Sequence, residues 1–128
     1  MSPHLRSPCP CGSGGPYDAC CGRLHRGAAQ ALTAEELMRS RYAAYAVGEL
    51  DHVLRTWHPR TRPDSLEPDP TMTWTRLTIL EVVDGSADDA HGIVEFEAHY
   101  RGPTGAGVRH ERSTFDRRGG RWVYVAAE

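Results

Sequence analysis

The chain has 128 residues, of which 39% are hydrophobic and 25% are charged, and its formal net charge is −2. This length fits one ordinary domain with a small appendage, and the composition is that of a soluble globular protein. The negative balance argues against nucleic-acid binding, which depends on a cationic surface. All 15 basic residues are arginines, so Schiff-base and general-base chemistry by lysine is excluded.

Neither a signal peptide nor a membrane segment is expected from the hydropathy of the chain. The N-terminal residues contain no apolar core of the kind that a signal peptide needs. Apolar runs such as residues 43–47 are too short to cross a bilayer. We therefore expect a cytoplasmic protein, in whose reducing environment clustered cysteines indicate metal or redox chemistry.

All four cysteines lie within thirteen residues, as Cys-x-Cys, eight intervening residues and Cys-Cys. Thiolates clustered around a Gly-Ser-Gly-Gly turn can surround one tetrahedral ion, and zinc is the ion that we expect. The predicted ligands are Cys9, Cys11, Cys20 and Cys21. Four cysteines leave no open coordination position for water, so the zinc would be structural, and its ligation would supply the folding energy of this short module.

The sequence also allows other states of the cysteines and other metal ligands. An iron–sulfur cluster uses the same ligand type, and oxidation could join Cys9 or Cys11 to Cys20 or Cys21. Two histidines flank the module, His4 and His25. They could substitute for a cysteine, although four thiolates already complete the set, and the simpler interpretation is that both are surface histidines.

The cysteine segment resembles a SEC-C motif, the zinc module at the C-terminus of the SecA translocation ATPase. The resemblance rests on Cys9-Pro-Cys-Gly-Ser-Gly14, Tyr17 and Cys20-Cys21. It implies zinc on the four cysteines and docking of a protein partner through the module. The family usually carries lysines beside the tyrosine, whereas this chain has Gly15, Pro16, Asp18 and Ala19. Docking through a basic surface is therefore less expected here.

Residues 1–28 are predicted to be the zinc module and a linker, and residues 29–128 the main domain, with residues 22–32 joining the two. Thr33-Ala-Glu-Glu36 has the form of a capping box. It predicts a helix from Ala34 to Val47, ended by Gly48. A second, short helix should begin near Asp51 and end at His58-Pro59.

The second half of the chain reads as a loop followed by strands. Four prolines between residues 59 and 70 predict a surface loop. Strands are expected at 73–83, 92–101, 108–117 and 121–126, with Gly119-Gly120 as a two-residue hairpin turn. Helices followed by an antiparallel meander indicate an α+β fold. A curved sheet wrapped around helices is the cone of the nuclear transport factor 2-like (ketosteroid isomerase-like) fold.

The chain as a whole, from about residue 8 to residue 126, is similar to the YchJ-like family of bacterial proteins. Beyond the cysteine module, the matching segments are Leu37–Tyr45, Thr56–Pro59, Val94–Phe96, His110–Phe115 and Gly120–Val125. The resemblance implies a SEC-C module joined to a nuclear transport factor 2-like domain. It leaves the function open.

Candidate pocket residues come from the first helix, from the end of the second and from two strands. They are Arg39, Tyr42, His58, Glu95, Glu97, His99, His110 and Arg112. A carboxylate on the strand 92–101 beside a histidine could form a general acid–base pair, and Arg39 with Tyr42 could bind an anionic or carbonyl-bearing ligand. His58 is either a pocket base or a ring that bonds the last helical carbonyls. The plainer alternative is that the strand residues are a solvated outer face or an Arg–Glu network.

Three functions follow from these features. The first is a protein-interaction or adaptor role through the zinc module, with the main domain as scaffold. The second is binding of a small molecule in the cone, and the third is an enzyme that uses the polar residues of the pocket. Proteins of this fold often pair through their sheets, so a homodimer is a further expectation.

Overall fold

A computed structural model gives the structure of residues 7–128; His4 lies outside these described residues. The helical elements come first: the 3-10 turn η1 (Tyr17–Ala19), then α1 (Cys21–His25), α2 (Ala34–Val47) and α3 (Leu50–Arg55). The strands follow as β1 (Thr73–Asp84), β2 (His91–Gly102), β3 (Gly105–Arg118) and β4 (Arg121–Ala127). Among the described residues, no helix is long and apolar enough to span a membrane.

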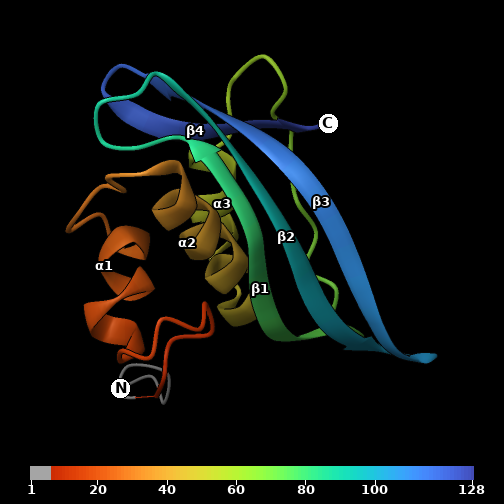
Figure 1. The fold of residues 1–128 in the computed structure, drawn as a ribbon. Coiled ribbons are helices and arrows are strands. Elements are labelled where there is room, and N and C mark those ends of the chain that lie inside the picture. The colour runs from red at the N-terminus through yellow and green to blue at the C-terminus, as the bar shows by residue number, and fades with distance from the viewer. Residues whose placement is uncertain (1–6) are drawn as a thin grey trace.

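The four strands form one antiparallel sheet in the order β1-β2-β3-β4. The sheet is curved, and its concave face covers α2 (Figure 1). Gly119 and Gly120 form the turn between β3 and β4 with φ of 59° and 81°, the left-handed region that a primed two-residue turn requires. The predicted α+β fold and its nuclear transport factor 2-like cone are confirmed.

Helix α2 has the predicted bounds because both of its ends are capped. Thr33 Oγ1 accepts a hydrogen bond from Glu36 N at 3.0 Å, and Gly48 closes the other end in the left-handed conformation with φ of 85°. Glu36 Oε1 accepts from Leu32 N at 2.7 Å, one residue earlier than in a standard capping box.

The core lies between α2 and the concave face of the sheet. It contains Ala34, Leu37, Met38, Tyr42, Leu77, Val94, Phe96, Ala98, Phe115 and Trp122. The loop between β1 and β2 closes over the start of α2, where Ala34 N donates to Gly85 O at 2.9 Å. A Cβ on Gly92 would lie 2.6 Å from Gly85 Cα, so this close approach requires glycine.

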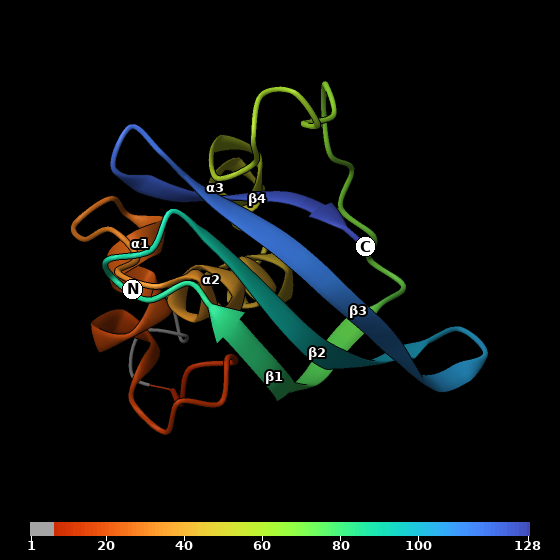
Figure 2. The same ribbon diagram turned by 45° about the horizontal axis from the view of Figure 1, so that its top comes forward.

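The segment after α3 runs beside β4. Tyr124 N donates to Thr56 O at 2.8 Å, and His58 N donates to Tyr124 O at 2.8 Å. Trp57 and Tyr124 form an isolated parallel bridge. These contacts place the segment after α3 along β4, at the edge of the sheet. Figure 2 shows α3 beside β4. Residues 59–71 contain neither helix nor strand, as the prolines predicted.

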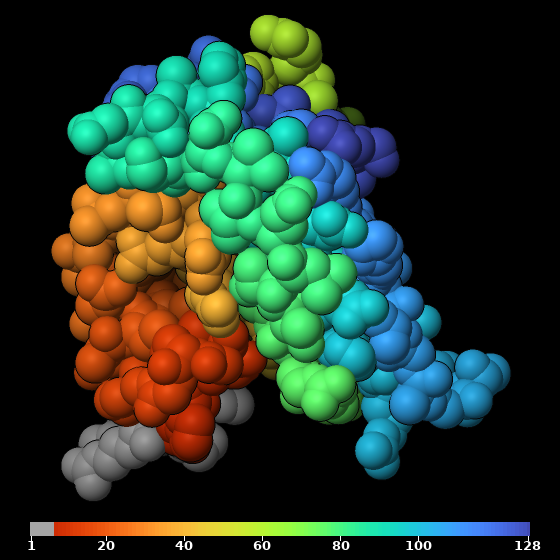
Figure 3. All heavy atoms as spheres, in the orientation of Figure 1, coloured from red at the N-terminus to blue at the C-terminus, as the bar shows by residue number. Residues whose placement is uncertain are grey.

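The cysteine module packs on the helical side of the molecule. Figure 3 shows it in red and orange on one side, with the sheet in green and blue on the other. The prediction of a linker over residues 22–32 was partly wrong, because its first residues belong to α1. Leu24 and His25 of α1 are buried, since α1 lies against α2 instead of tethering the module loosely.

Candidate metal centre and ligand pocket

The four cysteines converge in the folded module. Their Sγ atoms all lie within 4.8 Å of one another. Cys9, Cys11 and Cys21 are buried, whereas Cys20 is half-buried. The turn that brings the two pairs together is closed by a hydrogen bond of 2.9 Å from Cys9 N to Gly15 O.

The distances between sulfurs suit a tetrahedral metal site. With Zn–S bonds of about 2.3 Å, two ligands of a tetrahedron lie about 3.8 Å apart. Cys11 Sγ and Cys20 Sγ lie 3.7 Å apart. All four thiols are free of disulfides, so the arrangement is that of a ligand set, and it could hold one metal ion.

Hydrogen bonds among the sulfurs make the thiols unequal. Neighbouring thiols donate to Cys11, which lowers the pKa of Cys11 far below its usual range. The same bonds raise the pKa of Cys9 to about 11 and that of Cys21 well above its usual value. Among Cys9, Cys11 and Cys21, the protein by itself therefore favours the thiolate of Cys11, and a divalent cation would supply the charge that lets the other two ionise.

A buried chain of hydrogen bonds joins the module to α2. Tyr17 Oη lies 2.6 Å from His25 Nδ1, and His25 Nε2 lies 2.8 Å from the Ser40 carbonyl oxygen. Because a carbonyl only accepts, Nε2 carries the proton and Nδ1 accepts from the tyrosine. Burial lowers the pKa of His25, consistent with this neutral ring. His25 is therefore neither a substitute metal ligand nor a surface histidine, and both expectations for it are corrected.

The chain of contacts continues to α3. His52, 3% exposed, lies with Nε2 2.9 Å from Ser40 Oγ, and its ring centroid is 4.7 Å from that of His25. Arg55 Nη2 donates to the His25 carbonyl oxygen at 2.5 Å. Desolvation lowers the pKa of His52 to about 3. Two buried histidines thus face each other uncharged where three helices meet.

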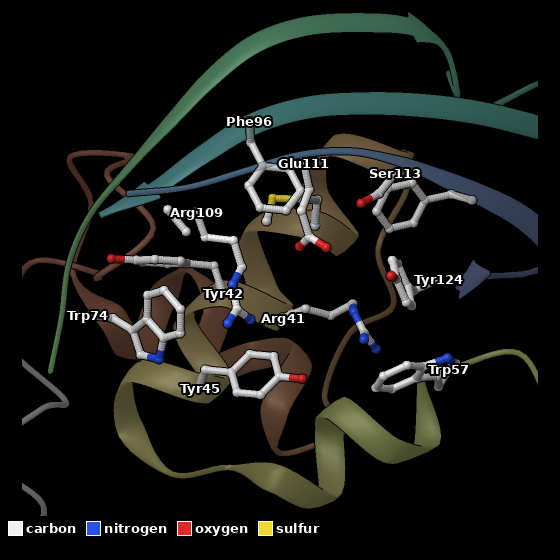
Figure 4. Close-up of a pocket in the computed structure, with 13 residues that line it drawn as sticks. Arg41, Tyr42, Tyr45, Trp57, Trp74, Phe96, Arg109, Glu111, Ser113 and Tyr124 are labelled. Atoms are coloured by element: carbon white, nitrogen blue, oxygen red, sulfur yellow. The ribbon is translucent and has the colours of Figure 1, made fainter. Parts of the chain in front are cut away.

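A cavity of about 200 Å³ opens between α2 and the concave face of the sheet (Figure 4). Its lining is Met38, Arg41, Tyr42, Tyr45, Trp57, Trp74, Phe96, Ala98, Arg109, Glu111, Ser113, Phe115 and Tyr124. The volume is below the 300–1,000 Å³ of sites for drug-sized molecules, so any ligand would be small.

Arg41 is buried in the wall of this cavity. It is 6% exposed, and its guanidinium carbon lies 5.0 Å from the Trp57 ring centroid and 4.5 Å from that of Tyr124. Its Nη1 donates to Val53 O at 2.7 Å and to Thr56 Oγ1 at 2.9 Å. Burial lowers its pKa to about 10, which still leaves it charged at neutral pH.

Among residues 7–128, the Glu111 carboxylate and the hydroxyls of Tyr42 and Tyr45 have no hydrogen-bond or ion-pair partner, while the Tyr124 hydroxyl lies next to the Ser113 side chain. Figure 4 shows Glu111 directed into the cavity between β3 and α2. Burial raises the pKa of Tyr42 to about 12 and also raises those of the other two tyrosines. The cavity therefore offers neutral hydroxyl donors and one carboxylate.

Five of the predicted pocket residues lie on the opposite face of the sheet. Val94, Phe96 and Ala98 are buried against α2, and side chains alternate along a strand. The outward-facing residues are Glu95, Glu97, His99, His110 and Arg112. Their expected role as pocket acids and bases is corrected.

The outer face instead carries an ion-pair network, the plainer alternative. Arg112 Nη1 lies 2.6 Å from Glu81 Oε1 and 3.1 Å from Glu95 Oε1, and its Nε lies 3.2 Å from Glu128 Oε2. His110 Nε2 lies 2.6 Å from the second Glu95 oxygen, and the bond from His110 keeps the pKa of Glu95 low.

Of the remaining candidates, only Tyr42 lines the cavity. Arg39 lies on the side of α2 that faces the cysteine module, where it donates to Cys11 O at 2.6 Å and pairs with Glu35 at 2.9 Å. His58 Nδ1 accepts from Arg60 N at 3.0 Å, outside the pocket lining. Helix geometry explains the difference, because 38, 41, 42 and 45 fall within about 100° of one another around an α-helix, whereas residue 39 lies about 120° from 45 and about 160° from 41.

Sequence reasoning missed Arg41, Arg109 and Glu111, which are the charged residues of the cavity lining. A signal was available for Glu111, since it alternates with His110 and Arg112 and so shares a face with Ser113 and Phe115. The signal for Arg41 was weaker, because an arginine in an amphipathic helix is normally expected at the surface.

The fold and the two sites together define a nuclear transport factor 2-like domain that carries a four-cysteine module. The family model described as "YchJ, middle NTF2-like domain" matches residues 33–127, and the SEC-C motif matches residues 6–23. The chain belongs to the YchJ-like family. Its division at residue 28 stays a prediction.

Relatives and solved structures agree with this assignment. A UPF0225 protein of Streptomyces coelicolor is 55% identical over 121 residues, covering 94% of each chain. A UPF0225 protein of Corynebacterium efficiens is 51% identical over 116 residues, or 91% of this chain and 88% of that one. The solution structure of a SEC-C motif containing protein from Rhodopseudomonas palustris matches with a TM-score of 0.83 at 36% identity, covering 95% of this chain and 98% of that one. The crystal structure of a sec-c motif containing protein from Psychrobacter arcticus matches with a TM-score of 0.79 at 25% identity, covering 95% of this chain and 82% of that one.

Proposed function

We propose that this protein binds a small, largely planar molecule in the cavity between α2 and the sheet. The observation that carries the proposal is the combination of aromatic walls with a carboxylate and two tyrosine hydroxyls, of Tyr42 and Tyr45, that have no partner among the described residues. Side chains do not fill the cone, and its volume of about 200 Å³ leaves room for a small ring compound.

The polar groups indicate the chemistry of that ligand. Neutral tyrosine hydroxyls and the Arg41 and Arg109 guanidiniums are hydrogen-bond donors, so they favour a ligand with a carbonyl or carboxylate oxygen. Arg109 lies over the Trp74 ring at 5.9 Å from its centroid, which places a positive charge at the cavity wall. Glu111 would accept a hydrogen bond from a donor elsewhere on the same ligand.

The proposed metal is zinc, in a structural role. Its ligands would be the four cysteines, whose thiolate chemistry and spacing suit a closed tetrahedral site. When bound, zinc would stabilise the module, and the module in turn supports the back of α2 through Arg39 and His25. The cavity residues Arg41, Tyr42 and Tyr45 lie on that same helix.

The pocket proposal can be tested with simple aromatic probes. Benzoate, acetophenone and benzylamine would be titrated into the protein while the fluorescence of its tryptophans is followed, since Trp57 and Trp74 line the cavity. We expect saturable binding of benzoate or acetophenone. An Ala98→Leu substitution should weaken that binding by roughly tenfold or more, because it fills the cavity.

An Ala106→Leu substitution is the matched control, because Ala106 is exposed and lies outside the cavity lining. It should leave the affinity within about twofold. The proposal fails if none of the three probes saturates, or if Ala98→Leu binds them as well as the unmodified protein does.

Docking of a protein partner through the module, an adaptor role and a homodimer stay predictions. The buried position of Tyr17, 7% exposed, limits what the motif itself presents, and Asp18 is paired with Arg26 at 2.8 Å. Retrieval of the same partners by a Cys20→Ser bait as by the unmodified chain would count against the adaptor role. The sedimentation coefficient in solution tests the dimer.

A further inference from the structure

A second cavity, of about 250 Å³, lies where the turn between β3 and β4 approaches α3 and the connection between α1 and α2. Figure 2 shows α3 beside β4 at this side of the sheet. The lining is Leu24, Gly27, Ala29, Gln30, Ala31, Leu37, His52, Arg55, Thr56, Trp57, Pro59, Arg62, Arg118, Arg121, Trp122 and Val123. Trp57 is the one residue that also lines the cavity proposed above; the other lining residues differ.

The charged residues of this lining all have the same sign. It contains four arginines, Arg55, Arg62, Arg118 and Arg121, and neither aspartate nor glutamate. Because the whole chain carries a formal charge of −2, such a local excess of positive charge is not a consequence of composition. A cavity lined by one sign of charge concentrates ions of the opposite sign.

Most of these guanidiniums are unpaired. Arg55 is held by the protein, since its Nη2 donates to the His25 carbonyl oxygen at 2.5 Å and to that of Leu24 at 3.3 Å. Arg62, Arg118 and Arg121 line the cavity without a side-chain hydrogen bond or ion pair to any residue among 7–128. Three positive charges are therefore left without a counter-charge from the described protein.

Two of the three are held against each other by the backbone. Arg118 and Arg121 are directly opposite partners in the β3–β4 ladder, and like charges at such positions destabilise a sheet. The Gly119-Gly120 turn fixes their register, so the two residues cannot slip apart along the strands. An anion bound between the guanidiniums would remove this repulsion.

We propose that this cavity binds a small phosphoryl anion such as pyrophosphate or a phosphomonoester. Guanidinium groups present paired N–H donors that match the oxygens of phosphate. A phosphoryl group carries a charge of about −1.5 to −2 near pH 7 and so offsets more of the three unpaired positive charges than a monocarboxylate does. The volume accommodates a group of this size, and the buried Trp122 ring forms part of its floor.

The test titrates inorganic pyrophosphate into the intact protein at low salt, with calorimetry and tryptophan fluorescence as readouts. We expect saturable binding that weakens as salt is added, and much weaker binding of acetate. An Arg118→Gln/Arg121→Gln double substitution should lower the affinity roughly tenfold or more, since it removes two charge-assisted contacts. Both side chains are exposed, so the fold should be retained.

The matched control is Arg76→Gln/Arg101→Gln, which removes the same charge from exposed positions outside this lining. It should leave the affinity for pyrophosphate within about twofold. Equal losses in both double variants would show a general charge effect and overturn the proposal, as would the absence of saturable binding. Binding of a short RNA oligonucleotide without binding of pyrophosphate would also overturn it, in favour of a polymer surface.

Discussion

The Nε2 atom of His25 lies 2.8 Å from the carbonyl oxygen of Ser40, so a side chain of the cysteine module hydrogen-bonds the backbone of α2. Both residues are buried, so water cannot replace this hydrogen bond. The helix that lines the cavity on one side is thus held by the cysteine module on the other.

Loss of the metal should therefore destabilise the whole chain. We expect one zinc per chain after purification without chelator, and a fall in melting temperature of at least about 5 °C when the zinc is removed. A Cys11→Ser variant should lose stoichiometric metal and melt at the lower temperature without chelator. Elemental analysis and circular dichroism measure both. Removal of zinc with no change in melting would show that the module does not stabilise α2.

The Tyr17 hydroxyl should contribute more to the free energy of unfolding than an average tyrosine hydroxyl does. A Tyr17→Phe substitution leaves His25 Nδ1 buried without its partner at 2.6 Å, which should cost about 1–3 kcal/mol in the free energy of unfolding. Tyr45→Phe is the control, because the Tyr45 hydroxyl has no such bond and the residue is 38% exposed. Its cost should stay within about 0.5 kcal/mol. Urea titrations of both variants compare them, and equal stabilities would contradict the assignment.

Acid should destabilise the protein through His52. The unfolded histidine takes up a proton near pH 6.5, whereas burial holds the pKa of His52 in the folded state at about 3. The unfolded state therefore binds more protons as the pH falls from about 6.5 to about 3, and stability is lost across that window. At pH 5 the loss from this one group should be about 2 kcal/mol. A His52→Gln variant should show a smaller fall between pH 7 and pH 5 in urea titrations; an unchanged fall would assign the acid sensitivity to other groups.

Arg41 should not tolerate replacement by lysine. A lysine lacks the planar guanidinium that lies between Trp57 and Tyr124 and bonds the Val53 carbonyl oxygen. We expect Arg41→Lys to lower the free energy of unfolding by about 1–3 kcal/mol. Arg109→Lys, at an exposed position of the same cavity, should change it by no more than about 0.5 kcal/mol. Similar losses in the two variants would mean that burial of Arg41 contributes little.

Local signals were enough to predict α2, α3 and the four strands, although not η1 or α1. Thr33 and Gly48 defined the ends of α2, and Gly119-Gly120 defined the last hairpin, because capping and turn geometry depend on the residue types at those positions alone. The four cysteines were likewise recognised as one ligand set from their spacing, and the folded chain brings their sulfurs together.

Local sequence patterns could not predict which side chains line the cavity. Alternation along β2 separates Glu95 from Phe96, but it does not say which of the two faces α2. In the structure the apolar side of β2 and β3 faces the helix, which turns Glu95 and His110 outward and directs Glu111 into the cavity. The burial of His25 was hidden for the same reason, since its partners Tyr17 and Ser40 belong to different elements.

The sequence by itself therefore determined which elements of the main domain form and which cysteines can share a metal, because these follow from short-range geometry and residue chemistry. Only the tertiary structure decided that Arg41 is buried, that Arg39 faces the module, and that Arg118 and Arg62 share one cavity. These relationships arise when hydrophobic burial fixes how α2 sits in the curved sheet. Every polar residue then takes the side that this packing leaves to it.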